Sequence, residues 1–155
     1  MREPLYSVER EYHVPIDVLW NAWVDADALQ QWYSPVGMPV VAGSVVSDAR
    51  EGGWWTVAVD ASAHGWIAYF YGTYTEVIAN ERLVHTMSYT QDATEFAARD
   101  LTAPHHIVEV DFDARGESSW VRFAQFGEMP EGQAEMAKAG MESYFDSLQA
   151  HLGLL

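Results

Sequence analysis

The sequence predicts an α+β fold in which a curved antiparallel sheet surrounds one long C-terminal helix, with two short helices after the first strand. Three observations favour it. From about residue 40 to residue 126, apolar and polar residues alternate with a period of two, as in half-buried strands. From residue 130 to residue 152, apolar residues recur every three or four positions, as in an amphipathic helix. Such a helix must bury its apolar stripe, and the sheet is the only large surface available.

The first strand is predicted over residues 6–13, where apolar and polar side chains alternate. Pro15 then stands where helices often begin, since the N–H that proline lacks has no partner there. The first helix is expected over residues 16–24. Asp25 is a good capping residue for a second short helix. Ser34-Pro35 should end that helix.

The rest of the sheet is predicted from consecutive segments joined by short turns, which makes it antiparallel. Its strands are expected over residues 40–49, 54–61, 65–78, 82–90, 105–113 and 118–126. The polar, aperiodic segment 91–104 is expected to be a loop. Gly43, Gly65 and Gly72 are candidates for the bends that curl the sheet. The last helix should place Met141, Tyr144 and Leu148 against it.

The chain has 155 residues, the size of one domain, and no linker divides residues 1–155. Its formal net charge is −15, from 23 acidic and 8 basic residues, which opposes binding to nucleic acid or to anionic membranes. Residues 1–7 lack the apolar core of a signal peptide, and residues 66–71 are too short an apolar stretch to span a bilayer. We expect a cytoplasmic protein, either a monomer or a homodimer.

No motif indicates a cofactor or a metal. The chain has no cysteine, no glycine-rich nucleotide-binding loop and no Gly-x-Ser-x-Gly sequence. His105 and His106 are neighbours on a predicted strand, so they should point to opposite faces and cannot share one ion. We therefore expect no cofactor and no metal site.

Several local motifs, taken in order, resemble one family over nearly the whole chain. They are Val14-Pro15, Leu29-Gln30-Gln31-Trp32-Tyr33-Ser34-Pro35, Glu51-Gly52-Gly53-Trp54-Trp55, Gly72-Thr73-Tyr74-Thr75-Glu76-Val77 and the Gly140-Met141 to Leu148 segment. They resemble the bacterial proteins named after the activator of heat-shock protein 90 ATPase, within the START-like (SRPBCC) superfamily. The resemblance implies the helix-grip fold, also called Bet v 1-like, with a deep cavity between the sheet and the C-terminal helix. It implies no single activity.

Two features depart from that family. Met141 stands where the family usually has a tryptophan, and the segment 91–104 is long and carries Phe96 and Leu101. Both features bear on which ligands the cavity would prefer.

Aromatic and methionine side chains are the best candidates for lining such a cavity. Methionines adapt to varied ligand shapes, and tyrosine hydroxyls orient a largely apolar guest. The candidate ligand-binding residues are Trp32, Tyr33, Trp55, Tyr69, Tyr71, Met87, Tyr89, Met141 and Tyr144. The alternative is that these side chains simply fill the core. The predicted partner is a small hydrophobic or aromatic molecule.

Two other functions remain open at this point. A polyketide cyclase-, dehydratase- or hydrolase-like enzyme would need a proton-transfer pair in the cavity, for which His85 with Glu76 or with a tyrosine is the best candidate. Glu76 alternates with Tyr74 and Gly72, so the three are expected on one face. Arg10 could hold an anionic head group or lie along the sheet edge. The family resemblance also suggests a chaperone-regulating interaction.

Overall fold

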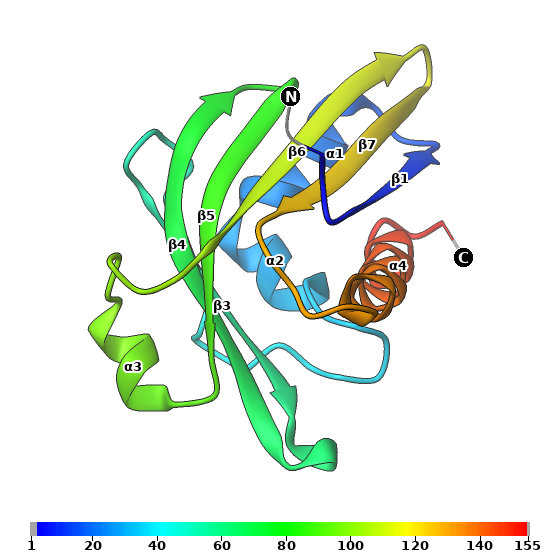
Figure 1. The fold of residues 1–155 in the computed structure, drawn as a ribbon. Helices are drawn as coiled ribbons and strands as arrows, with labels where there is room; N and C mark the ends of the chain where they lie inside the picture. The colour runs from blue at the N-terminus through cyan, green and yellow to red at the C-terminus, as the bar shows by residue number, and fades with distance from the viewer. Residues whose placement is uncertain (1–2, 155) are drawn as a thin grey trace.

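The computed structural model describes residues 3–154, in which one antiparallel sheet curves around a long helix (Figure 1). Its strands are β1 Tyr6–Tyr12, β2 Val46–Ser47, β3 Trp54–Ala61, β4 Trp66–Ile78, β5 Arg82–Thr90, β6 His106–Arg115 and β7 Ser118–Phe126. Their order in the sheet is β1-β7-β6-β5-β4-β3-β2. The predicted α+β helix-grip architecture is confirmed.

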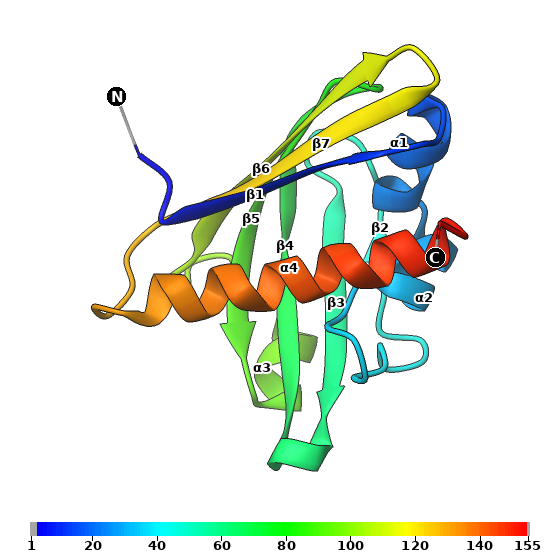
Figure 2. The same ribbon diagram turned by 90° about the vertical axis from the view of Figure 1, so that its right-hand side faces the viewer.

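The longer helices lie on the concave side of the sheet, and the shortest α-helix lies on its convex face. The helices are α1 Ile16–Val24, α2 Ala26–Trp32, α3 Ala93–Ala98 and α4 Gln133–His151, with a 3-10 turn η1 at Ser62–His64. Figure 2 shows α4 crossing the strands on the concave face, with α1 and α2 near its C-terminal end. The predicted cap is present, because the Asp25 carboxylate accepts a hydrogen bond from the Ala28 N–H at 3.1 Å. Within the described residues, no helix is both long enough and apolar enough to cross a membrane.

The core is an aromatic cluster centred on Trp23 of α1. The Trp23 ring contacts Trp32 from α2, Phe112 and Phe123 from the sheet, and Phe145 from α4, with centroid separations of 4.9 to 6.3 Å. Edge-to-face ring contacts of this kind stabilise a core beyond the area they bury. They join α1, α2, α4 and the sheet into one packed unit.

Two segments differ from the predicted elements. The predicted strand 40–49 shrinks to the two residues of β2 plus an isolated bridge from Val40 to Val59. Gly43 has a φ of 76°, which ends the extended conformation. The Ser44 hydroxyl then accepts the Ala58 N–H at 3.1 Å in place of a ladder bond.

The predicted loop 91–104 contains a short helix, α3. The Asp92 carboxylate caps it by accepting the Thr94 N–H at 2.8 Å. Its Phe96 ring packs on Tyr69 with centroids 4.8 Å apart, on the convex face of the sheet. A helix of six residues with one large apolar side chain has too weak a period to be recognised in the sequence.

A β-bulge in β4 changes which side chains face the concave side. Tyr74 pairs with His85, whereas Glu76 pairs with Val84, so the register shifts between them. The extra residue places Glu76 on the convex face while Tyr74 stays in the core. The prediction that Glu76 and Tyr74 share a face was therefore wrong.

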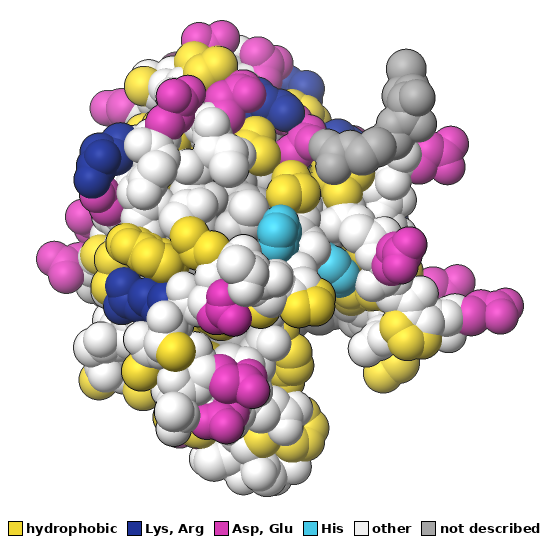
Figure 3. Space-filling model, turned by 60° about the vertical axis from the view of Figure 1, so that its left-hand side comes forward, with side chains coloured by type: hydrophobic (Ala, Val, Ile, Leu, Met, Phe, Trp, Pro, Cys, Tyr) yellow, Lys and Arg dark blue, Asp and Glu magenta, His cyan; other side chains and the backbone are white. Residues whose placement is uncertain are grey.

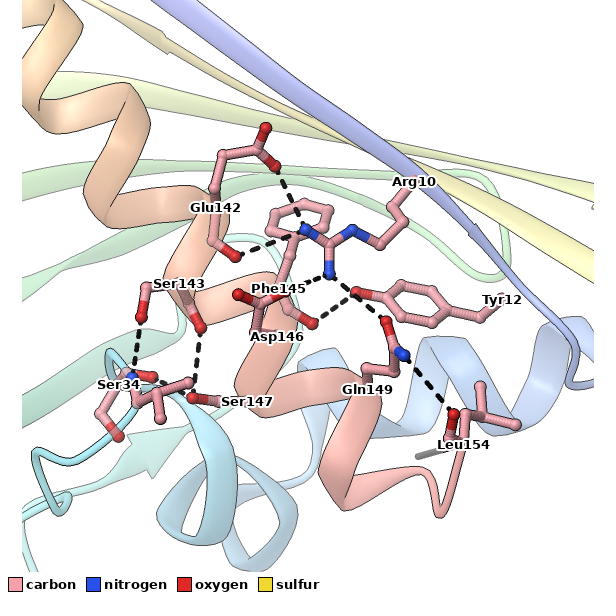
Figure 4. Close-up of polar contacts among 11 residues, drawn as sticks. Arg10, Tyr12, Ser34, Glu142, Ser143, Phe145, Asp146, Ser147, Gln149 and Leu154 are labelled. Carbon is pink, nitrogen blue, oxygen red and sulfur yellow. Dashed lines mark hydrogen bonds and ion pairs between the residues drawn. The ribbon is translucent and has the colours of Figure 1, made fainter.

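Contacts from two sides hold the C-terminal half of α4 (Figure 4). On the β1 side, the Arg10 guanidinium lies 2.8 Å from the Asp146 carboxylate and 3.3 Å from that of Glu142. The Tyr12 hydroxyl donates to the Phe145 carbonyl oxygen at 2.8 Å. The Arg10 guanidinium therefore pairs with carboxylates of α4, and not with an anionic head group, which was one of the two roles considered for it from the sequence.

The segment after α2 holds the same half of the helix from the other side (Figure 4). The Val36 N–H donates to the Ser143 hydroxyl at 2.9 Å, and the Ser147 hydroxyl donates to the Ser34 carbonyl oxygen at 2.7 Å. Among residues 3–154, every side-chain hydrogen bond from α4 to another element involves a position from Glu142 onward. The first half of α4 makes no such bond within the described residues.

Candidate functional site

A pocket of about 840 Å³ lies between the first half of α4 and the concave face of the sheet. Strands β1, β4, β5, β6 and β7 form its floor, and the segment 127–130 closes one side. From α4 the lining side chains are Gln133, Ala137, Met141 and Tyr144, beside the backbone of Gly140. Figure 3 shows a recess on this side of the molecule, with hydrophobic side chains on its walls and histidine side chains beside it.

Most of the floor is apolar. Phe70 from β4 and Tyr89 from β5 pack together with ring centroids 5.3 Å apart. Met87 lies two residues before Tyr89 on the same face, and Phe123 of β7 pairs with Tyr6 of β1, 6.2 Å apart in a stacked arrangement. Flat rings and a flexible thioether make a surface suited to an apolar guest.

Two tyrosines, Tyr33 and Tyr144, present hydroxyl groups to this apolar space. Their rings meet edge to face with centroids 5.1 Å apart. Within residues 3–154 neither hydroxyl has a hydrogen-bond partner, and the single fully enclosed side-chain polar atom without one is the Trp23 indole nitrogen. The Tyr33 and Tyr144 hydroxyls therefore keep contact with the open volume of the pocket.

Burial raises the pKa of both phenols. The pKa of Tyr33 lies well above its ordinary value, first because of burial and then because of the neighbouring Tyr144 and Tyr6 hydroxyls. Burial likewise raises the pKa of Tyr144. Both groups are neutral hydrogen-bond donors at physiological pH.

A chain of directed hydrogen bonds forms the polar rim. The Tyr6 hydroxyl donates to the Gln125 side-chain carbonyl oxygen at 2.6 Å, and the Gln125 amide donates to His106 Nδ1, also at 2.6 Å. His106 Nε2 then donates to the Glu128 carbonyl oxygen at 3.1 Å. This arrangement uses His106 as a neutral ring protonated on Nε2, since Nδ1 must accept. It also commits the Tyr6 hydrogen to Gln125.

Five of the nine predicted ligand-binding residues line this pocket, namely Tyr33, Met87, Tyr89, Met141 and Tyr144. The other four lie elsewhere. Trp32 is 1% exposed in the core, and its indole N–H donates to the Ala22 carbonyl oxygen at 2.7 Å. Trp55 is 2% exposed and lies between Tyr33 and His85.

Tyr69 and Tyr71 point away from the pocket, to the convex face. The register places Trp55 opposite Gly72, so the concave face of β4 carries the even-numbered positions 68, 70 and 72. Tyr69 and Tyr71 alternate with these positions, and Phe96 of α3 covers both rings.

The residues considered for proton transfer do not meet in the pocket. His85 is 4% exposed and its Nδ1–H donates to the Thr86 carbonyl oxygen at 2.8 Å. Burial lowers the pKa of His85 to about 4. Glu76 forms an ion pair with Arg82 at 2.9 Å on the convex face. Among the described residues, no group of three or more His, Asp or Glu side chains is placed to hold a metal ion.

Several lining residues were not among the predicted ones. On the sheet they are Tyr6, Phe70, Phe123, Gln125 and His106, and the rest come from α4 and the loops beside it. The alternation of apolar and polar residues within β1 puts Tyr6, Val8 and Tyr12 on one face. The same period-two rule on β7, followed from Val121, would have selected Phe123 and Gln125.

Known structures with this fold resemble the chain over most of its length. The AHSA1 protein of Silicibacter pomeroyi has a TM-score of 0.78 at 20% sequence identity, covering 96% of this chain and 97% of that one. A protein from Chromobacterium violaceum has a TM-score of 0.76 at 21% identity, covering 94% of each chain. A Staphylococcus epidermidis protein has a TM-score of 0.76 at 19% identity, covering 95% and 88%. These likenesses show the fold alone.

No curated protein sequence matches the chain. The family model described as activator of Hsp90 ATPase homolog 1-like protein matches residues 13–153, nearly the whole chain. The match includes the first-helix entry, the Gly-Gly turn and the last helix on which the sequence resemblance rested. The chain therefore belongs to the activator of Hsp90 ATPase homolog 1-like family.

Proposed function

We propose that this protein binds a small hydrophobic or aromatic molecule in the pocket between its sheet and α4. The observation that carries the proposal is the pocket itself, about 840 Å³ and lined mainly by aromatic, methionine and proline side chains. Ligand sites for small molecules typically combine such an apolar wall with a few placed polar groups. Tyr33, Tyr144 and the Tyr6–Gln125 pair supply those groups here.

The binding energy would come chiefly from burying the guest. Each Å² of apolar surface removed from water contributes about 25 cal/mol. A flat polycyclic molecule enclosed by Phe70, Phe123 and Met141 then reaches micromolar affinity without any charged contact. Binding of this kind requires no cofactor, and the acidic surface disfavours nucleic acid as a competing partner. We place this activity in the cytoplasm, in a single domain acting as a monomer or homodimer.

A cavity-filling variant tests the proposal. Gly140 lines the pocket from α4, and a Cβ added there meets no atom within 4 Å. Gly140→Leu would therefore occupy ligand space without harming the helix, since leucine is a better helix former than glycine. Met136→Leu is the matched control, because Met136 lies on the same helix, outside the pocket, and is 74% exposed.

The measurement has two parts. Native mass spectrometry of the protein purified from its own host should show a retained small molecule. Equilibrium dialysis against a panel of flavonoids, polyketides and fatty acids should give micromolar binders whose affinity falls about tenfold in Gly140→Leu and stays unchanged in Met136→Leu. If the affinity of the binders is the same in Gly140→Leu as in the unmodified protein, the binding site lies elsewhere. The complete absence of any bound molecule in both experiments would contradict the proposed function.

A further inference from the structure

Displacing water from this pocket leaves two hydroxyl groups in need of an acceptor. Tyr33 is 4% exposed and lies beneath the pocket, and Tyr144 extends over it from α4. Neither hydroxyl has a partner within residues 3–154. A guest without a hydrogen-bond acceptor would displace water from both hydroxyls without replacing its hydrogen bonds. The lost hydrogen bonds would then weaken the binding free energy.

Four tyrosines line the pocket, and they differ in what they can offer. Tyr89 is 52% exposed, and its hydroxyl accepts from the Gln91 side-chain amide at 2.7 Å. Tyr6 has given its hydrogen to Gln125, so it presents lone pairs and can accept. The hydroxyl hydrogens of Tyr33 and Tyr144 make no hydrogen bond to any group within residues 3–154, and both side chains are neutral phenols. Their rings touch, so the two donor groups come from adjacent points of the wall. A carbonyl oxygen has two lone pairs, so it is the kind of acceptor that can serve two donors.

The charges around the pocket restrict the guest further. Neither lysine nor arginine occurs among its lining residues, and Glu128 is one of them. The chain as a whole has a net charge of −15. His106 accepts from Gln125 at Nδ1 and is neutral in that arrangement. A buried carboxylate would find no lysine or arginine among the lining residues to compensate its charge, and its desolvation cost would not be recovered.

We propose, resting on the function proposed above, that the ligand is a neutral and largely apolar molecule with a carbonyl-type oxygen, which accepts hydrogen bonds from Tyr33 and Tyr144. Aromatic ketones, quinones and neutral polyketide carbonyl compounds belong to this class. Free fatty acids and other carboxylates do not. The two hydroxyls give the guest its orientation, and the apolar walls give it affinity.

A pair of nearly isosteric probes tests the hydrogen bonds. Fluorene and fluorenone differ only in a methylene group replaced by a carbonyl, and equilibrium dialysis reports the affinity of each. The variants are Tyr33→Phe and Tyr144→Phe, which keep the rings and remove hydroxyls that no group within residues 3–154 hydrogen-bonds. Tyr74→Phe is the matched control, because Tyr74 is buried outside the pocket and its hydroxyl bonds Ser47 at 2.8 Å.

We expect fluorenone to bind the native protein about 25-fold more tightly than fluorene, about fivefold for each of two ordinary hydrogen bonds. Tyr33→Phe and Tyr144→Phe should each remove about one fivefold factor for fluorenone and leave fluorene within about twofold. Tyr74→Phe should change neither. Binding of both probes with equal affinity, or a preference for fluorenone that survives both substitutions, would overturn the inference while leaving the proposed function intact.

A second comparison tests the charge. Fluorenone-4-carboxylate should bind more weakly than its methyl ester, although the ester is larger. Equal or tighter binding of the carboxylate would overturn the restriction to neutral guests. If none of the four probes binds, the proposed function fails for this class of molecule, and this inference fails with it.

Discussion

The imidazole ring of His85 lies on the indole ring of Trp55, with centroids 4.1 Å apart and an angle of 27° between the planes. Tyr74 meets the same imidazole edge to face at 5.9 Å. His85 is thus enclosed by aromatic rings, and within residues 3–154 its only hydrogen bond runs from Nδ1–H to the Thr86 carbonyl oxygen. Among these neighbours there is no carboxylate to stabilise an imidazolium ion, so burial keeps the ring neutral.

Stability should therefore fall as the pH is lowered through the weakly acidic range. Burial lowers the pKa of His85 from 6.5 to about 4, so below pH 6.5 the unfolded chain binds a proton that the folded chain refuses. The contribution of neutral His85 to the free energy of unfolding is fully present above pH 6.5 and is lost progressively as the pH falls to about 4. It amounts to about 3 kcal/mol. Urea unfolding at a series of pH values measures it.

His85→Gln is the test of that assignment. Glutamine does not titrate, so the variant should be less stable at pH 7 and should lose less stability between pH 6.5 and pH 4. His64→Gln is the control, because His64 is exposed in the 3-10 turn. An unchanged pH profile in His85→Gln would show that other groups cause the acid sensitivity.

Two glycine-to-alanine substitutions should have opposite effects. A Cβ at Gly72 would overlap the Thr86 carbonyl group of the neighbouring strand, so Gly72→Ala should push β4 and β5 apart and cost about 1–3 kcal/mol. A Cβ at Gly140 meets open space in a helix, so Gly140→Ala should stabilise by up to about 1 kcal/mol. Each kcal/mol shifts Tm by about 2–4 °C in a chain of this size. Calorimetry that found the same sign for both would contradict the geometry.

The packing of α4 should depend on its buried face alone. Phe145 is completely buried in the aromatic cluster around Trp23, and Phe145→Ala should destabilise the protein by about 3–5 kcal/mol. Met136, on the same helix and 74% exposed, should tolerate alanine within about 0.5 kcal/mol. Chemical denaturation of the two variants makes the comparison. Similar losses in both would mean that helix propensity, and not burial, governs the result.

Arg82 should be the most salt-sensitive contributor to stability. Its guanidinium lies between three carboxylates, at 2.9 Å from Glu76, 2.8 Å from Glu109 and 2.7 Å from Asp111. Arg82→Met would leave these acidic groups facing one another and should cost about 1–2 kcal/mol at low salt. The loss should shrink in 1 M NaCl, where the screening length is about 3 Å. A loss independent of salt would indicate that the arginine stem acts through packing.

The order of the elements followed from the sequence because hydrophobic period is a local property. The helix that became α4 and the strand that became β7 were both recognised from their spacing alone. The bulge before Glu76 could not be recognised this way. One extra residue reverses the face of everything after it, and nothing in the local composition marks the position.

The pocket was predicted only in part, for a different reason. Trp32 and Tyr33 are adjacent and chemically alike, yet one donates to the Ala22 carbonyl oxygen in the core and the other lines the pocket. The end of α2 decides between them, and that end depends on contacts with α4. Tyr69 and Tyr71 were placed on the wrong face for lining this pocket because the alternation in β4 does not say which side of the sheet α3 will cover.

Side-chain hydrogen bonds to other elements hold α4 at its C-terminal half only, which leaves the pocket beside its first half adjustable. Moving residues 133–141 away from the sheet would break no side-chain hydrogen bond to another element within residues 3–154, whereas moving the following turns would break those from Arg10, Tyr12 and Ser147. Gly132, with a φ of 85°, stands at the free end as a pivot. A small outward bend of residues 133–141 would therefore enlarge the pocket for a thicker guest at the cost of apolar contacts alone, with the hydrogen-bonded half of α4 and the aromatic core left in place.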